Sequence, residues 1–175
     1  VLWNRYRHPV VRDPRRIRDA CQVPFVEEVG DDPHQLSRIQ AFVLAAPRSP
    51  RLLLLVSPRK ADTLDEFTTE FVEQLHSADV ACERLRGPQL DDLSTGAHAN
   101  SLAIVEAPGV LDDPPRLDAI ANRPVTAVIV VRRGRTLLED VVELRSYLEL
   151  IDVSDVRGVV VYRPSRRNRG TASKP

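Results

Sequence analysis

The chain has 175 residues, of which 42% are hydrophobic and 29% charged, which is long enough for one globular domain with a buried core. No apolar run approaches the roughly 18 residues that a membrane span needs. The two cysteines, Cys21 and Cys82, exclude a disulfide scaffold and a CxxC motif, and the four histidines show no metal-ligand spacing. We therefore expect no metal site.

The formal net charge of zero hides an uneven distribution of charge along the chain. Residues 1–18 hold six arginines and one aspartate, for +5, and residues 163–175 hold four arginines and one lysine, also for +5. The stretch 19–162 holds 14 basic and 24 acidic residues and carries −10. Basic patches can indicate nucleic-acid binding, but the acidic body and the low aromatic content of 5% argue against it.

The first residues combine aromatic and basic side chains: Trp3, Arg5, Tyr6 and Arg7. Aromatic rings next to arginines are typical of a chain that leaves a membrane on its cytoplasmic side, and an irregular basic tail is the alternative. Anionic lipids of the inner leaflet attract such segments at roughly 1 kcal/mol per basic residue. Since the chain begins at Val1 and contains no methionine, we expect a segment of a longer protein with a membrane span upstream.

The first elements in chain order are two short helices around an extended segment. Asp13-Pro14 combines a capping residue with a proline at the first helical position, which predicts a helix that ends before Pro24. Residues 25–29 are expected to be extended. Asp32-Pro33 repeats the start signal, and the second helix ends before Pro47.

From Arg51 the pattern alternates between strands and helices. Strands are predicted at 52–56, 80–85, 102–105, 125–131 and 156–162, and helices are predicted after the capping boxes at Thr63 and Thr136 and from Pro114. This alternation predicts an α/β fold in three layers, a mostly parallel, doubly wound sheet with helices on both faces. We expect a basic arm at 1–12, one domain at 13–162 and a basic disordered tail at 163–175.

Ligands of such sheets usually bind at the carboxyl ends of the strands. Three loops are placed there by the predicted elements: 57–63, 106–113 and 132–136.

One segment of the chain resembles a known family. It reads Ala103-Ile-Val-Glu-Ala-Pro-Gly-Val-Leu-Asp-Asp113, then a helix, then Val128-Ile-Val-Val-Arg-Arg-Gly-Arg-Thr136. This order resembles the second half of bacterial tyrosine kinases (BY-kinases), the P-loop kinases of capsule and exopolysaccharide export, in which one strand ends in Asp-x-Pro-Pro and the next in Val-x-x-Gly-x-Thr. The resemblance spans roughly residues 50–162 and implies a P-loop NTPase-like fold.

The chain departs from this family at the phosphate-binding loop. A working P-loop reads G-x-x-x-x-G-K-[ST], with glycines that let backbone N–H groups approach the phosphates. The corresponding stretch from Ser57 to Thr63 contains no glycine, and the family's lysine position falls near Asp62, whose carboxylate would repel a triphosphate. Lys60 could reach an anion at the helix N-terminus; a solvated loop lysine is the alternative.

The acidic motifs also depart from the family. The strand at 80–85 carries only Glu83 in place of an aspartate pair, and Glu106 replaces the aspartate of the next motif, followed by Pro108 and Gly109. We interpret Glu106 as an exposed acid at the end of a strand rather than a residual magnesium ligand. The degenerate nucleotide-site positions are Ser57, Arg59, Lys60, Asp62, Thr63, Glu106 and Pro108.

Other candidate residues have simpler interpretations. Asp112 and Asp113 are expected to cap the helix that begins at Pro114. Ser94 and His98 lack the strand–turn–helix setting of a nucleophile elbow. The loop 132–135 could hold an anionic partner, with a solvated loop as the alternative.

The family resemblance, with the nucleotide-binding residues replaced and no tyrosine after residue 162, implies a pseudo-kinase without catalytic residues, cofactor or metal. It implies a non-catalytic cytosolic interaction module of a membrane-anchored regulator of capsule or exopolysaccharide chain length or export, at the cytoplasmic face of the bacterial plasma membrane. Expected partners are copies of itself, a cognate kinase or export membrane protein, and anionic lipids, but not nucleic acid. The alternatives are a divergent active tyrosine kinase or ATPase that uses ATP and Mg²⁺, and an unrelated α/β regulatory domain.

Overall fold

The computed structural model describes residues 9–32, 34–45, 52–60, 62, 64–85, 101–113, 124–153 and 155–163. Several predictions of the sequence fall outside these ranges: Trp3, Arg5, Tyr6, Arg7, Thr63, Ser94, His98, the helix from Pro114 and the tail after residue 163. No helix in the described ranges is long and apolar enough to span a bilayer.

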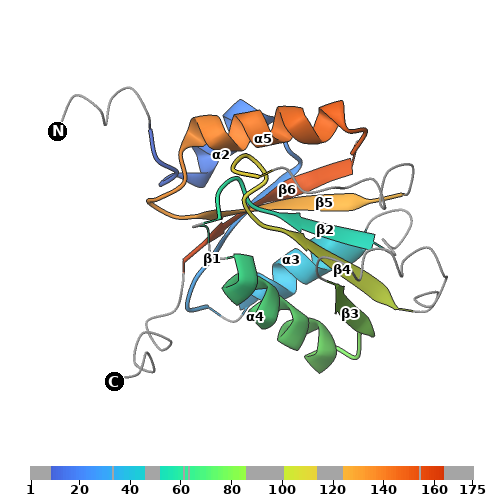
Figure 1. Cartoon of the computed structure of the whole chain (residues 1–175). Helices are drawn as coiled ribbons and strands as arrows, with labels where there is room; N and C mark the ends of the chain where they lie inside the picture. Colours follow the sequence, from blue (N-terminus) through green and yellow to red (C-terminus); the bar gives the residue numbers. More distant parts are fainter. Residues whose placement is uncertain are drawn as a thin grey trace, which may run out of the picture.

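The described residues form a six-stranded sheet with four helices packed on it (Figure 1). The strands are β1 (Phe25–Val29), β2 (Leu52–Val56), β3 (Cys82–Leu85), β4 (Leu102–Ala107), β5 (Thr126–Arg132) and β6 (Asp155–Tyr162). The helices are α2 (Pro14–Cys21), α3 (His34–Leu44), α4 (Leu64–Ser77) and α5 (Leu138–Leu150). The strands lie in the order β1-β6-β5-β2-β4-β3, and every pair is parallel. The predicted α/β class is confirmed.

Two apolar cores lie on opposite faces of the sheet. Helices α2 and α5 cover one face and α3 and α4 the other (Figure 1). Along β2, Leu52, Leu54 and Val56 belong to the first core, whereas Leu53 and Leu55 belong to the second. Because side chains of a strand alternate between faces, a strand covered on both sides must be apolar at every position. This explains the uninterrupted apolar runs of the central strands.

The first two helix starts are confirmed in atomic detail. Asp13 caps α2, because its Oδ1 accepts a hydrogen bond of 2.9 Å from the backbone N–H of Arg15. Asp32 Oδ1 accepts an equivalent bond of 3.0 Å from the N–H of His34. Each bond satisfies a backbone donor that the helix itself leaves unpaired.

Other boundaries differ from the predictions. β4 continues to Ala107 rather than ending at 105, because Glu106 and Ala107 pair in register with Leu55 and Val56 of β2. β3 starts at Cys82 rather than at 80, after a turn in which Asp79 has a φ of 56°. The capping box predicted at Thr136 is wrong: the N-cap of α5 is Leu137, with no side-chain hydrogen bond, because the Thr136 hydroxyl is bonded elsewhere.

Gly158 allows β6 to fit against its neighbour β1, which gives a testable prediction. A Cβ at this position would lie 2.5 Å from both the carbonyl oxygen and the Cδ1 of Phe25. We expect Gly158→Ala to lower the free energy of unfolding by about 1–3 kcal/mol, because part of this contact is rigid backbone. Urea denaturation measures the change.

Gly30→Ala is the matched control, since the nearest atom to its added Cβ is 3.9 Å away. It is expected to change stability by less than about 0.5 kcal/mol. Equal midpoints for the two variants would contradict the close approach of β1 and β6.

Candidate functional site

The three loops singled out in the sequence meet at the carboxyl edge of the sheet. They follow β5, β2 and β4, which are neighbours in the strand order. After β2 the chain continues into α4 on one face, and after β5 into α5 on the other. Such a change of face between adjacent strands is where doubly wound folds place their ligands. The geometry between β2 and β5 therefore decides what this edge can bind.

The loop after β2 is held against the loop after β4 by backbone hydrogen bonds. Ser57 N–H donates to Ala107 O at 3.2 Å, and Val110 N–H donates to Ser57 O at 3.0 Å. The N–H of Gly109 adds a bond of 3.2 Å to the buried Ser57 hydroxyl oxygen. The two loops thereby extend the pairing of β2 and β4 beyond the strands.

Gly109 makes this contact possible. Its φ is +66°, and a Cβ would lie 2.3 Å from Cγ and 2.8 Å from the backbone nitrogen of Lys60. Only glycine combines that conformation with that proximity. Gly109 thus lets the loops after β2 and β4 come into contact.

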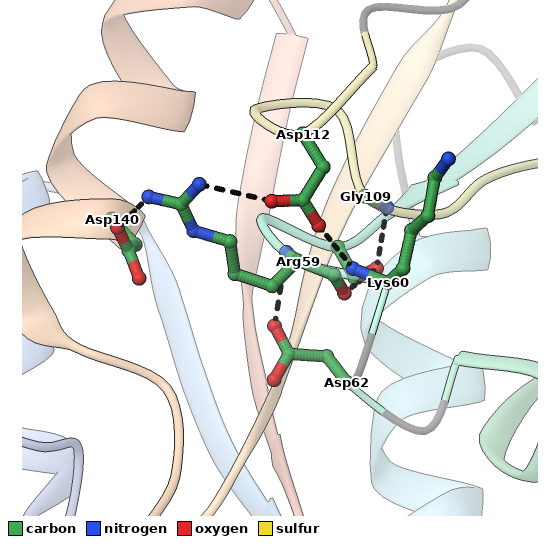
Figure 2. A network of polar contacts seen from close by, with 7 residues as sticks. Arg59, Lys60, Asp62, Gly109, Asp112 and Asp140 are labelled. Atoms are coloured by element: carbon green, nitrogen blue, oxygen red, sulfur yellow. Dashed lines mark hydrogen bonds and ion pairs between the residues drawn. The ribbon is translucent and has the colours of Figure 1, made fainter.

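Arg59 bridges two acidic side chains from different elements (Figure 2). Its Nη1 donates to Asp112 Oδ1 at 3.0 Å and its Nη2 donates to Asp140 Oδ1 at 2.7 Å. The Asp140 side chain, in the first turn of α5, is only 6% exposed. The hydrogen bond to Asp140, followed by that to Asp112, raises the pKa of Arg59. The guanidinium is therefore fixed as a cation between α5 and the loop after β4.

Asp112 also binds the backbone of the loop after β2. Its Oδ2 accepts a hydrogen bond of 2.8 Å from the N–H of Lys60. This bond, followed by the one from Arg59, lowers the pKa of Asp112. Both carboxylate oxygens of Asp112 thus contact the loop 57–60. The sequence predicted only that Asp112 caps the helix from Pro114, so this contact was not foreseen.

The Lys60 side chain points away from this network (Figure 2) and is 62% exposed. Its Nζ lies 3.5 Å from Oδ2 of Asp113, which is itself 76% exposed. An exposed ion pair at this distance contributes little to stability. Lys60 is thus mostly solvated, as expected for the alternative of a solvated loop lysine.

Asp62 and Thr136 connect the ends of β2 and β5. Asp62 is 5% exposed, and its Oδ1 accepts a hydrogen bond of 2.6 Å from the hydroxyl of Thr136. Its Oδ2 accepts a bond of 3.2 Å from the N–H of Arg59, and the Thr136 oxygen accepts one of 2.9 Å from the N–H of Arg132. Burial raises the pKa of Asp62, although the hydrogen bonds from Thr136 and from the N–H of Arg59 oppose the shift. The Asp62 carboxyl group is therefore part of the folded core.

A second ionic cluster lies on β3 and β4. Arg84 donates from Nε and Nη2 to the two carboxylate oxygens of Glu106, both at 2.7 Å. It also contacts Asp65 and donates to the Thr69 hydroxyl at 3.1 Å, both on α4. The Glu106 side chain is 7% exposed. The prediction of an exposed strand-end acid is therefore wrong, because the register of β3 and β4 places an arginine beside it.

The remaining predicted positions do not join these clusters. Pro108 is exposed in the turn after β4, and Arg133 and Arg135 are exposed in the turn after β5, where Arg133 contacts Glu28 of β1. Within the described ranges, no group of three or more His, Cys, Asp or Glu side chains is arranged to hold a metal ion.

Sequence reasoning did not identify Arg84 or Asp140 as parts of this edge. Asp140 lies 81 positions from Arg59 and Arg84 lies 22 positions from Glu106. An acidic residue in the first turn of a helix has an ordinary explanation in the helix dipole, so Asp140 gave no signal of its own. The strand order alone brings these pairs together.

Comparison with known proteins shows the fold. No family model matches the chain, and no curated protein matches it. Among solved structures, the tyrosine kinase domain of BceF superposes with a TM-score of 0.63 at 14% sequence identity, over 89% of this chain and 100% of that one. The chain therefore has the fold of that tyrosine kinase domain.

The raised pKa of Asp62 gives a prediction about the pH dependence of stability. The folded protein retains the Asp62 proton at pH values where the unfolded chain has lost it, so this residue disfavours folding increasingly as the pH rises above its unfolded pKa. We expect Asp62→Asn, which cannot ionise, to gain stability relative to the wild type between about pH 4 and pH 7.

Urea denaturation across this pH range measures the trend, in which any constant effect of the substitution cancels. Asp19→Asn, at an exposed position of α2, controls for the loss of one negative charge. If the stability gained by Asp62→Asn over the wild type stays constant or falls as the pH rises, the raised pKa of the buried Asp62 is contradicted.

The Arg84 cluster gives a prediction about stability at neutral pH. Arg84→Met removes hydrogen bonds that join β3, β4 and α4 around a nearly buried carboxylate, and we expect a loss of about 2–3 kcal/mol. Arg38→Met removes an exposed pair with Glu27 and is expected to cost at most about 1 kcal/mol. Similar urea midpoints for both variants would show that the cluster is not structural.

Proposed function

We propose that this chain is a non-catalytic, kinase-like interaction module of a membrane-anchored regulator of capsule or exopolysaccharide chain length or export. One observation carries the proposal: at the carboxyl edge, Arg59, the backbone N–H of Lys60 and Glu106, which stand at positions that the resemblance assigns to the nucleotide site, are bonded to the protein's own charged side chains.

The described residues of the loop after β2, 57–60 and 62, offer few donors to a phosphate. A P-loop binds phosphates through consecutive backbone N–H groups. Here Pro58 has no N–H, the N–H of Arg59 donates to Asp62, and the N–H of Lys60 donates to Asp112. A triphosphate in this position would have to displace one carboxylate and would lie close to another. The electrostatics of the loop therefore oppose the ligand that its fold relatives bind.

The residues around Glu106 do not fit a magnesium ion either. Mg²⁺ is held by oxygen ligands in a near-octahedral arrangement, and Glu106 is the acid that the family motif would supply. Both of its oxygens accept hydrogen bonds from the Arg84 guanidinium, whose positive charge opposes a cation at the same place. The described residues do not fit Mg-ATP, and phosphoryl transfer depends on the positioning and charge stabilisation that they fail to supply.

The proposed partners are proteins with related domains. A fold retained without its nucleotide chemistry can still dock against related domains, so we propose copies of this chain or an active kinase as partners, with an export membrane protein nearby. The regulated polymer and the location at the inner face of the plasma membrane follow from the family resemblance and the basic N-terminal arm. Both belong to the proposal.

Nucleotide titration tests the proposal most directly. We expect isothermal titration of the chain with Mg-ATP to show no binding up to millimolar concentration, and incubation with Mg-ATP to leave its tyrosines unphosphorylated by mass spectrometry. Lys60→Ala should behave identically, since the Lys60 side chain is solvated.

A divergent active kinase would give a different pattern. Micromolar affinity for Mg-ATP that Lys60→Ala abolishes and Arg38→Ala preserves would overturn the proposal. Arg38 is the matched control because it is a basic residue on α3, with a side chain that is 56% exposed.

A further inference from the structure

The chain segment before α2 is attached to the loop after β5. Val11 N–H donates to Thr136 O at 2.8 Å, Leu138 N–H donates to Pro9 O at 2.9 Å, and Gly134 N–H donates to Val11 O at 2.7 Å. Val10 and Leu137 form an antiparallel bridge. Val11 is 2% exposed and belongs to the core under α2 and α5. Residues 9–11, which we call the strap, thus pair with the backbone of residues 134–138.

The paired loop is the part of the molecule that holds the edge together. Thr136 donates its hydroxyl to buried Asp62, and Asp140, two residues after the end of the paired segment, accepts from Arg59. Arg59 and Lys60 in turn bind Asp112. A continuous series of contacts therefore leads from the strap through residues 134–140 to the loop 57–60.

We propose that the strap is a conformational control of this edge: when residues 9–11 are docked, Asp62 and Arg59 are held, and when they are displaced, the loop 57–60 loosens. The strap lies within the basic arm predicted at residues 1–12, so a change in the arm reaches the former nucleotide site through it. The inference extends the proposed function, but its test contains no nucleotide, so that either can fail alone.

The physical reason lies in how the loop after β5 is supported. Its turn at residues 133–135 is exposed, and exposed turns open locally at low cost in free energy. The three backbone bonds and the buried Val11 side chain supply support from a segment distant in sequence. Without them, Thr136 and Asp140 are carried by a turn and by the first residues of α5, where helices fray.

The first experiment weakens the strap in the full 175-residue chain. Val11→Ala removes two methyl groups from its anchor, and Val43→Ala, at a position of α3 that is 1% exposed, makes the same change in the other core. Hydrogen exchange is followed by NMR at the amides of Arg59, Lys60 and Asp62. We expect exchange there to be at least tenfold faster in Val11→Ala than in Val43→Ala.

The second experiment locks the strap and does not depend on a weakened core. Val10 and Leu137 form the non-hydrogen-bonded pair of an antiparallel bridge, in which Cα atoms are about 4.5 Å apart, within the range of a disulfide. In the variant Val10→Cys/Leu137→Cys/Cys82→Ser, we expect oxidation to slow exchange of the Arg59 and Lys60 amides at least threefold, and reduction to restore it.

Two results would overturn the inference. One is faster exchange in Val11→Ala that is confined to residues 9–11 and 134–138, which would make the strap a local contact. The other is an oxidised variant whose amides in the loop 57–60 exchange as fast as those of the reduced form. Equal acceleration in Val11→Ala and Val43→Ala would point to global unfolding and would also count against it.

Discussion

The hydrogen bond between Thr136 and Asp62 joins the two strands at which the chain changes from one face of the sheet to the other. In a doubly wound fold this junction leaves a crevice, because the connections that follow the two strands diverge. Here a buried carboxylate and a buried hydroxyl bridge it. Burial of the carboxylate is unfavourable in itself, and the donors from Thr136 and Arg59 offset part of that cost. The arrangement of the whole carboxyl edge follows from this bridge.

Around the bridge, several polar groups of the described part of the edge are bonded within the protein. The guanidinium of Arg59, the backbone N–H of Lys60 and the hydroxyl of Ser57 each have partners on a neighbouring loop or helix. In a nucleotide-binding relative, groups at such an edge are kept available for phosphates and metal. Closure of the edge by ion pairs of its own supports the proposal that this domain acts by docking. Because these contacts come from several segments, the conformation of the edge also depends on each of those segments, including the strap.

Much of the fold could be predicted because its signals are local. The apolar runs at β2 and β5 and the caps at Asp13 and Asp32 each depend on a few consecutive residues, and each is confirmed. One error arose where a residue had two possible partners. Thr136 has the sequence context of a capping residue, but its hydroxyl donates to a carboxylate 74 positions away. Competition of this kind is decided by distance in space, which a local pattern does not contain.

For the candidate site, the sequence by itself determined which loops lie at the carboxyl edge and that glycines and the expected lysine are missing from the first of them. It also determined the separation of charge into basic ends and an acidic body. Only the tertiary structure decided the pairing of those charges: Arg59 with Asp112 and Asp140, and Arg84 with Glu106. The reason is physical, since an ion pair forms between groups that the strand order and register bring within about 3 Å, and neither order nor register is written in any one stretch of the chain.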